Sequence, residues 1–212
     1  MNRRIVITCG PSYAPIDDVR RITNFATGEI GVLLANAFAA VGCEVVCFKG
    51  EAATTTLAFA PGVDARAFST NDDLAAQLDA LGEAAAVFHA AALGDYEVES
   101  VRDEDGTLQT AAKIPSRVGG LHLTLRPARK VLPELRGMFP FARIVGWKYE
   151  LNGTLADALH AGAHQLEACG TDRCVVNGAA YGEGFGLLDS QGRVRHFADK
   201  AELCAGLVAA FG

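Results

Sequence analysis

The chain has 212 residues, of which 50% are apolar and 21% charged, and its formal net charge at pH 7 is −6. This composition supports one well-buried domain over residues 1–212 and excludes a disordered, collagen-like or mucin-like chain. The negative charge argues against nucleic acid as the main partner, although it is compatible with a local basic pocket for one phosphate ligand.

The first half of the chain alternates short apolar runs with helical patterns, and turn residues separate them. The predicted elements are a strand at 4–9, a helix at 28–41, strands at 44–48 and 64–68, a helix at 71–81 and a strand at 85–91. This order favours a Rossmann-like α/β fold, in which helices cover both faces of a mostly parallel, doubly wound sheet.

The segment 94–120 interrupts this alternation, because charges cluster in it and neither the strand period nor the helix period persists. We expect one long flap loop there, of the kind that is functional or mobile, rather than a domain boundary. The remaining predicted elements are a strand at 121–125, a helix at 128–138 that is interrupted near Pro133, a strand at 142–147, a helix at 154–169, a strand at 173–176, a hairpin of 186–189 with 193–197 and a helix at 199–211.

The cysteines indicate whether the chain binds a metal, and the apolar runs indicate where in the cell the protein is located. Six cysteines are scattered without a Cys-x-x-Cys pair or a histidine at zinc-ligand spacing, and four of them lie within apolar runs. We therefore expect reduced core cysteines and no metal site built from side chains. The apolar run that follows Arg4 ends at Gly10, too early for a signal peptide, and no run approaches the roughly 18 apolar residues of a membrane span. A cytoplasmic protein that does not bind membranes is the prediction.

The loop between the first strand and the first helix is the first candidate site. It begins at Gly10 and Ser12 and ends at Thr27 and Gly28, where the helix starts. Ligands of open α/β sheets gather outside the carboxyl ends of the strands, and a glycine-flanked helix start offers free amide donors to an anion. The alternative, which the sequence supports equally, is that Thr27 caps the helix and the glycines permit tight packing.

The end of the strand at 85–91 is the second candidate. Small residues follow His89, and Asp95 comes next, so a planar ring or a sugar could approach the backbone there while the carboxylate accepts hydrogen bonds. The alternative is an ordinary turn at Asp95 and a satisfied core imidazole at His89, which is the better interpretation for that histidine. Lys113, within the flap loop, is the third candidate: it could close over a phosphate, although most single lysines are simply solvated.

Seven short motifs follow one another along the chain. They are Thr8-Cys9-Gly10-Pro11-Ser12, Ile22-Thr23-Asn24, Thr27-Gly28, Ala90-Ala91-Ala92 with Asp95-Tyr96, Lys113-Ile114, Val145-Gly146-Trp147-Lys148 and Val175-Val176-Asn177. Together they resemble the phosphopantothenate–cysteine ligase family, also called phosphopantothenoylcysteine synthetase, over nearly the whole chain. With no flavin-decarboxylase half before Met1 and with Lys148 after Trp147, we expect the single-function form.

This resemblance implies a reaction in coenzyme A biosynthesis that joins 4′-phosphopantothenate to cysteine. CTP or ATP, with Mg²⁺, first forms an acyl-nucleotide and releases pyrophosphate, and the amine of cysteine then displaces the nucleoside monophosphate. Asn24 would bind the carboxylate and the acyl-nucleotide, and Lys113 would cover the reacting phosphate from the flap. A homodimer is implied as well, with each site completed across subunits. The implied nucleotide-binding residues are His89, Ala90, Ala91, Asp95, Arg129, Lys130, Val131, Leu132 and Trp147.

The chain also departs from the family pattern. Glu29 stands where a basic residue or histidine is common, and an acid there would repel a nearby phosphate. Gln165 and Cys169 replace lysines of bifunctional members, and Arg129-Lys130 replaces a Pro-Asp pair. A divergent nucleotide-binding paralogue without ligase activity is therefore one alternative. The other, an NAD(P)-dependent oxidoreductase, lacks sequence support because neither TGxxxGxG nor Tyr-x-x-x-Lys occurs.

Overall fold

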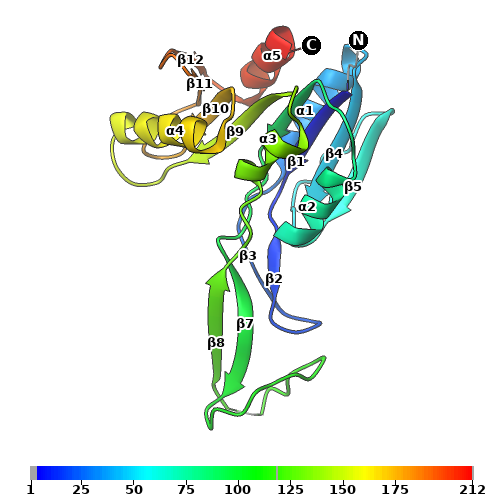
Figure 1. Ribbon diagram of the computed structural model, residues 1–212, viewed down its shortest axis with the longest axis vertical. Coiled ribbons are helices and arrows are strands. Elements are labelled where there is room, and N and C mark those ends of the chain that lie inside the picture. Colours follow the sequence, from blue (N-terminus) through cyan, green and yellow to red (C-terminus); the bar gives the residue numbers. More distant parts are fainter. Residues whose placement is uncertain (1–3, 118, 212) are drawn as a thin grey trace.

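The computed structural model describes residues 4–117 and 119–211, and an eight-stranded sheet forms its centre (Figure 1). The strand order is β12-β11-β10-β9-β6-β1-β4-β5. The six strands from β10 to β5 are parallel, and β11 and β12 add antiparallel to β10. This confirms the Rossmann-like, mostly parallel sheet and the C-terminal hairpin. The strands are β1 (Arg4–Cys9), β4 (Glu44–Gly50), β5 (Val63–Phe68), β6 (Ala86–His89), β9 (Arg143–Tyr149), β10 (Arg173–Asn177), β11 (Phe185–Asp189) and β12 (Val194–Phe197).

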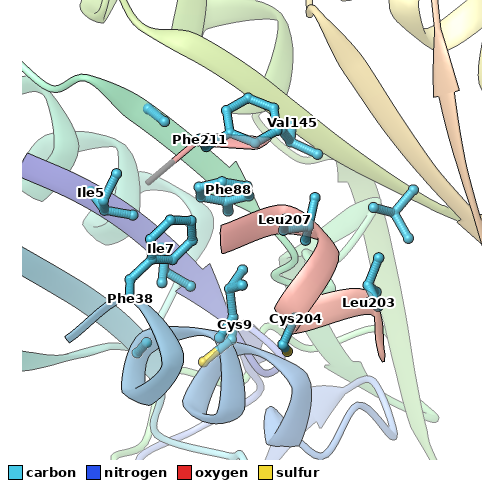
Figure 2. Packing of buried hydrophobic residues seen from close by; sticks show 14 of the residues in the cluster. Ile5, Ile7, Cys9, Phe38, Phe88, Val145, Leu203, Cys204, Leu207 and Phe211 are labelled. Carbon is cyan, nitrogen blue, oxygen red and sulfur yellow. The ribbon is translucent and has the colours of Figure 1, made fainter. Parts of the chain in front are cut away.

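Helices cover both faces of the sheet, because the central strands are apolar on both sides. Along β1, Ile5 and Ile7 face one core and Val6 faces the other, as the two-residue period of a strand requires. The first core joins Phe38 of α1 to Phe88 of β6, with ring centroids 5.1 Å apart, and also contains residues of α5 (Figure 2). The second core lies under α2 and α3. The helices are α1 (Glu29–Ala40), α2 (Asn71–Asp79), α3 (Leu135–Met138), α4 (Leu155–Cys169) and α5 (Lys200–Phe211).

Helix α4 illustrates how local sequence signals set the element bounds. Thr154 and Asp157 form a capping box, in which the hydroxyl accepts from the Asp157 amide and the carboxylate accepts from the Thr154 amide. Gly170 ends the helix in the left-handed conformation, with φ of 61°. The predicted helix at 154–169 is confirmed, and its buried side, including Leu166, packs over β10.

The chain reverses its direction of winding between β1 and β6. From β1 it proceeds to β4 and β5 on one side, and from β6 to β9 and β10 on the other. The crossovers therefore diverge at this point and leave a crevice outside the carboxyl ends of these two strands, which is where ligands of doubly wound sheets bind.

A two-stranded arm projects from the sheet, where the sequence predicted an irregular loop (Figure 1). Strand β7 (Tyr96–Asp103) pairs antiparallel with β8 (Leu121–Pro127), so the flap expected over 94–120 is an arm whose connecting segment follows β7. The prediction was wrong because β7 is stabilised by its partner strand rather than by a core: Glu97, for example, forms an ion pair of 2.6 Å with Arg126. A small ladder of β2 (Tyr13–Pro15) and β3 (Arg21–Thr23) was also missed.

The helix predicted at 128–138, with an interruption near Pro133, is shorter than expected. Residues 128–131 belong to neither a helix nor a strand, and the rest of the segment forms the 3₁₀ turn η1 (Leu132–Glu134) and the short α3. Pro133 lies within η1, where it has no amide hydrogen to donate. The amide of Ala128 donates instead to the carbonyl of Asp95, at 2.9 Å, which ties the start of the segment to the other side of the crevice.

The cysteines agree with the sequence prediction. All six are free thiols, and Cys9, Cys47, Cys174 and Cys204 are buried. Among residues 4–117 and 119–211, helices long and apolar enough to cross a membrane are absent.

Candidate functional site

Two neighbouring cavities open at the crevice. The Asn24 cavity has a volume of about 250 Å³ and is lined by Ser12, Tyr13, Ala14, Pro15, Ile22, Thr23, Asn24, Thr70, Asn71, Gly94, Asp95, Tyr96, Glu97, Leu125 and Ala128. The Trp147 cavity has a volume of about 350 Å³ and is lined by His89, Ala91, Ala92, Leu93, Gly94, Asp95, Arg129, Lys130, Val131, Leu132, Pro133, Trp147, Lys148, Tyr149, Gln165 and Cys169. Gly94 and Asp95 line both, so a ligand in one cavity can meet a ligand in the other across these two residues.

Gly94 and Asp95 form the wall between the two cavities. Side chains of the segment between β1 and α1 hold this wall in place. Ser12 is only 2% exposed, and its hydroxyl accepts from the Gly94 amide at 2.8 Å. The side-chain amide of Asn24 donates to the carbonyl of Ala92 at 2.9 Å, and the Ala92 amide donates to the carbonyl of Gly10 at 3.0 Å. Asn24 is exposed rather than hidden in the core, so its side chain lies where a ligand of the Asn24 cavity can reach it.

At the start of α1 the structure supports tight packing of the glycines, but Thr27 is not the helix cap. Gly28 precedes the helix with φ of 79° and no side-chain cap, and the Thr27 hydroxyl accepts weakly from the Glu29 amide at 3.3 Å. A Cβ atom on Gly28 would lie 3.3 Å from Cα of Gly10, so the glycines let helix and strand approach closely. Gly10, Thr27 and Gly28 line neither cavity. Glu29 is neutralised by Lys200, whose ammonium lies 2.5 Å from its carboxylate.

His89 is one of the residues that line the Trp147 cavity. It is 6% exposed, and its Nδ1 is 2.8 Å from the hydroxyl of Thr8. Burial lowers the pKa of the imidazole to about 4, so the ring is neutral at physiological pH. The histidine therefore combines a core position, as the residue-based interpretation expected, with a place in the cavity wall.

The positive charges of the Trp147 cavity are all paired with carboxylates. The Arg129 guanidinium donates to both oxygens of Glu134, at 2.5–3.1 Å, and Lys148 lies 2.9 Å from Glu150. Lys130 forms an ion pair with Asp95. Eight of the nine nucleotide-binding residues that the resemblance implied line this cavity, and Ala90 does not.

Two buried polar atoms close to this cavity have no hydrogen-bond partner in the described part of the chain. They are Nε1 of Trp147 and Oδ1 of Asn177. Asn177 ends β10 and is in register with Tyr149, which lines the cavity. An unpaired buried polar atom costs about 1–3 kcal/mol, so a rearrangement that gives either atom a partner stabilises the protein.

Lys113 lies outside both cavities. With Arg20, Arg117 and their neighbours it lines a separate cavity of about 340 Å³. This segment is anchored by Asp17, whose carboxylate accepts from the Ile114 amide and from Arg20. Burial alone would raise the pKa of the Asp17 carboxyl, but these hydrogen bonds and those from the backbone of residues 19 and 20 outweigh it and lower that pKa to about 2. Lys113 and Asn24 thus line different cavities.

Asn71 lies at the site, although the sequence pattern placed it only as the first residue of the helix predicted at 71–81. Thr70 is the cap, since its side chain accepts from the Asp73 amide. The Asn71 amide nitrogen instead donates to the carbonyls of Gly94 and Arg129, both at 2.9 Å, and the residue is 7% exposed. Its position in the sequence could have revealed it, because a polar residue just after β5 lies at the same edge of the sheet as the polar residues that follow β1 and β6.

The chain matches the family described as "DNA/pantothenate metabolism flavoprotein C-terminal domain" over residues 1–203. It belongs to this family. Curated relatives include a "Cysteine/Cysteine sulfinic acid decarboxylase" from an unknown prokaryotic organism, 28% identical over 97% of this chain and 57% of the relative. The "Coenzyme A biosynthesis bifunctional protein CoaBC" of Bacillus subtilis is 29% identical over 87% of this chain and 42% of the relative. The chain thus spans about half the length of these relatives.

Solved structures support the fold of this family member. The DNA/pantothenate metabolism flavoprotein from Streptococcus pneumoniae superposes with a TM-score of 0.85 at 19% identity, covering 98% of this chain and 97% of that one. A Cab2 variant in complex with phosphopantothenate-cysteine superposes with a TM-score of 0.72 at 18% identity, covering 99% and 86%. At these identities the likeness establishes the arrangement of strands and helices.

Proposed function

We propose that this domain is a ligase that joins 4′-phosphopantothenate to the amine of cysteine through an acyl-nucleotide. The observation that carries the proposal is the pair of cavities that share Gly94 and Asp95, since the reaction needs a carboxylate and a nucleotide to meet. Membership of a pantothenate-metabolism family supports the choice of substrate. In the first step, a carboxylate oxygen bonds to the α-phosphorus and pyrophosphate leaves; in the second, the cysteine nitrogen bonds to the acyl carbon and the nucleoside monophosphate leaves.

The Trp147 cavity is the proposed nucleotide site. Its floor is made of small residues such as Ala91, which admit a planar base or sugar to the backbone. The unpaired Nε1 of Trp147 and Oδ1 of Asn177, which are buried in the free chain, would offer a donor and an acceptor once binding makes them accessible, and an amino-substituted base can satisfy that pair of functions. Both cytosine and adenine have such edges, so CTP and ATP are both candidates.

The Asn24 cavity is the proposed site of the carboxylate. Its walls mix apolar side chains, for example Ile22 and Leu125, with the polar groups of Ser12, Asn24 and Asn71, which suits a substrate with an aliphatic chain and amide groups. The Asn24 amide would hold the carboxylate and then the acyl-nucleotide. Its removal is expected to cost on the order of 2–4 kcal/mol of transition-state stabilisation, the value typical of a preorganised donor to a developing oxyanion.

Lys113 would act on the site of a second subunit. In its own subunit it lines a different cavity from Asn24, and it lies on the segment that connects β7 to β8. A homodimer in which this segment covers the partner's nucleotide would bring the exposed ammonium to the reacting phosphate. Outside both cavities, the backbone of Gly10 after β1 and of Thr27 and Gly28 before α1 would bind phosphates that extend beyond the Trp147 cavity, because the helix begins without a side-chain cap.

Magnesium would enter with the nucleotide and neutralise part of the charge on the triphosphate. The described residues contain no group of three or more His, Cys, Asp and Glu side chains arranged to hold a metal ion. A magnesium ion bound mainly through phosphate oxygens needs no such cluster, so the residues present fit this arrangement. A cytoplasmic location follows from the substrates and is part of the proposal.

A pyrophosphate-release assay tests the proposal. The chain is incubated with Mg²⁺, 4′-phosphopantothenate and either CTP or ATP, and cysteine is added later. We expect pyrophosphate release that requires both substrates, followed by cysteine-dependent release of the nucleoside monophosphate. Nucleotide binding without pyrophosphate release would indicate the non-catalytic paralogue instead and would refute the ligase.

A further inference from the structure

The two cavities differ in charge in a way that raises a mechanistic problem. The charged residues that line the Asn24 cavity are Asp95 and Glu97, both acidic. A carboxylate substrate must pass these groups to approach a triphosphate, which is itself an anion. Positive charge is therefore needed where the cavities meet, since it stabilises the additional charge that develops on the phosphate in the transition state.

Three cations of the Trp147 cavity are available, and they differ in their partners. Arg129 is held by two carboxylates, that of Glu134 and that of Asp72, which lies 3.6 Å away. Lys148 forms an ion pair with Glu150, which is two residues further along the chain. Lys130 instead pairs with Asp95, which lines both cavities. Of these three cations, Lys130 is the one placed at the meeting point.

The backbone that carries Lys130 is clamped to the same wall. The Ala128 amide donates to the Asp95 carbonyl at 2.9 Å. Asn71 uses its side-chain nitrogen to hold the carbonyls of Gly94 and Arg129 together, and it is almost fully buried. Lys130 therefore approaches the wall from a fixed backbone, and only its side chain has to move when a ligand arrives.

We propose that Lys130 is a further catalytic residue, whose ammonium moves from Asp95 to the α-phosphate of the nucleoside triphosphate as the acyl-nucleotide forms. This inference rests on the proposed ligase function. In that step, the new bond joins a carboxylate oxygen to the α-phosphorus, and the bond from the α-phosphorus to the bridging oxygen breaks with its electron pair leaving on pyrophosphate. Lys130 donates to a non-bridging α-phosphate oxygen, keeping its own proton. Asp95 holds the ammonium at the wall before the nucleotide binds.

The variant Lys130→Met tests this role in the full chain. The single-turnover rate of pyrophosphate release is measured with saturating phosphopantothenate and either CTP or ATP, before cysteine is added. We expect a fall on the order of 100-fold, as for loss of an oxyanion donor, and a partial return of the rate in Lys130→Arg. Nucleotide affinity, followed by the fluorescence of Trp147, the one tryptophan of the chain, changes far less. The Lys130 side chain is 57% exposed, so its replacement leaves the fold intact.

A matched control is Arg66→Met, which removes one positive charge from an exposed ion pair with Asp64 on the edge strand β5. Its rate of pyrophosphate release should equal that of the unmodified chain. If Lys130→Met also releases pyrophosphate at the unmodified rate, or loses only nucleotide affinity, the inference is wrong while the ligase function stands. If the unmodified chain binds nucleotide but releases no pyrophosphate, the ligase function and this inference both fail.

Discussion

Asn71→Ala is the substitution that most sharply tests how the site is built. Removing the side chain abolishes the two 2.9 Å hydrogen bonds to the carbonyls of Gly94 and Arg129 and leaves both acceptors without this donor in a part-buried environment. A lost hydrogen bond with an unsatisfied buried partner costs about 1–3 kcal/mol. Allowing for partial access of water to the cavity, we expect a loss of about 3 kcal/mol in the free energy of unfolding, or roughly 6–12 °C in Tm for a chain of this size.

The assay is thermal and urea unfolding, with Gln77→Ala as the control. Gln77 lies on the same helix and also donates from one amide nitrogen to two oxygens, those of Ala67 and Asp73, but it is less buried. Its removal should cost no more than about 1 kcal/mol, because water replaces the lost partners. Asn71→Ala should also slow pyrophosphate release, since the wall between the cavities shifts. Equal stability losses in the two variants would show that burial of the Asn71 amide does not matter and would refute this reasoning.

Three further predictions concern pH and packing. Because the pKa of Asp17 is lowered to about 2 from 3.8, its stabilisation is complete above pH 4 and is lost between pH 4 and 2; Asp17→Asn should abolish this acid-dependent step in urea unfolding. The pKa of His89 falls to about 4 from 6.5, so stability should decline as pH drops from 6.5 to 4, and His89→Gln should flatten that slope. Gly31→Ala places a Cβ 2.1 Å from that of Cys9 and should cost about 1–3 kcal/mol, whereas Gly137→Ala, with open space around it, should cost nothing in thermal unfolding.

The sequence predicted the sheet well for a physical reason. Strands such as β1 and β6 are buried on both faces, so they read as apolar runs with abrupt ends. Strand β7 was missed because its residues are mostly half-buried or exposed and its order comes from pairing with β8, whose Arg126 is 29 residues away from Glu97. Pairing of this kind leaves little trace in local composition.

The site was predicted in part. Residues at strand ends, such as Asp95 and Trp147, converge because parallel strands end at one edge, and the family resemblance had already grouped them. The partner of Lys130 could not be predicted, since the two residues of the ion pair are 35 positions apart and meet only after folding. The same holds for Asn71, whose acceptors are 23 and 58 positions away.

Oxygen transfer tests the central claim most directly. Phosphopantothenate labelled with ¹⁸O in its carboxylate is incubated with the chain, Mg²⁺, cysteine and CTP or ATP, and the nucleoside monophosphate is analysed by mass spectrometry. If the carboxylate attacks the α-phosphorus, one ¹⁸O atom appears in each molecule of nucleoside monophosphate formed, and the pyrophosphate is unlabelled. Amide formation with an unlabelled monophosphate, or with the label in another product, would contradict the acyl-nucleotide route.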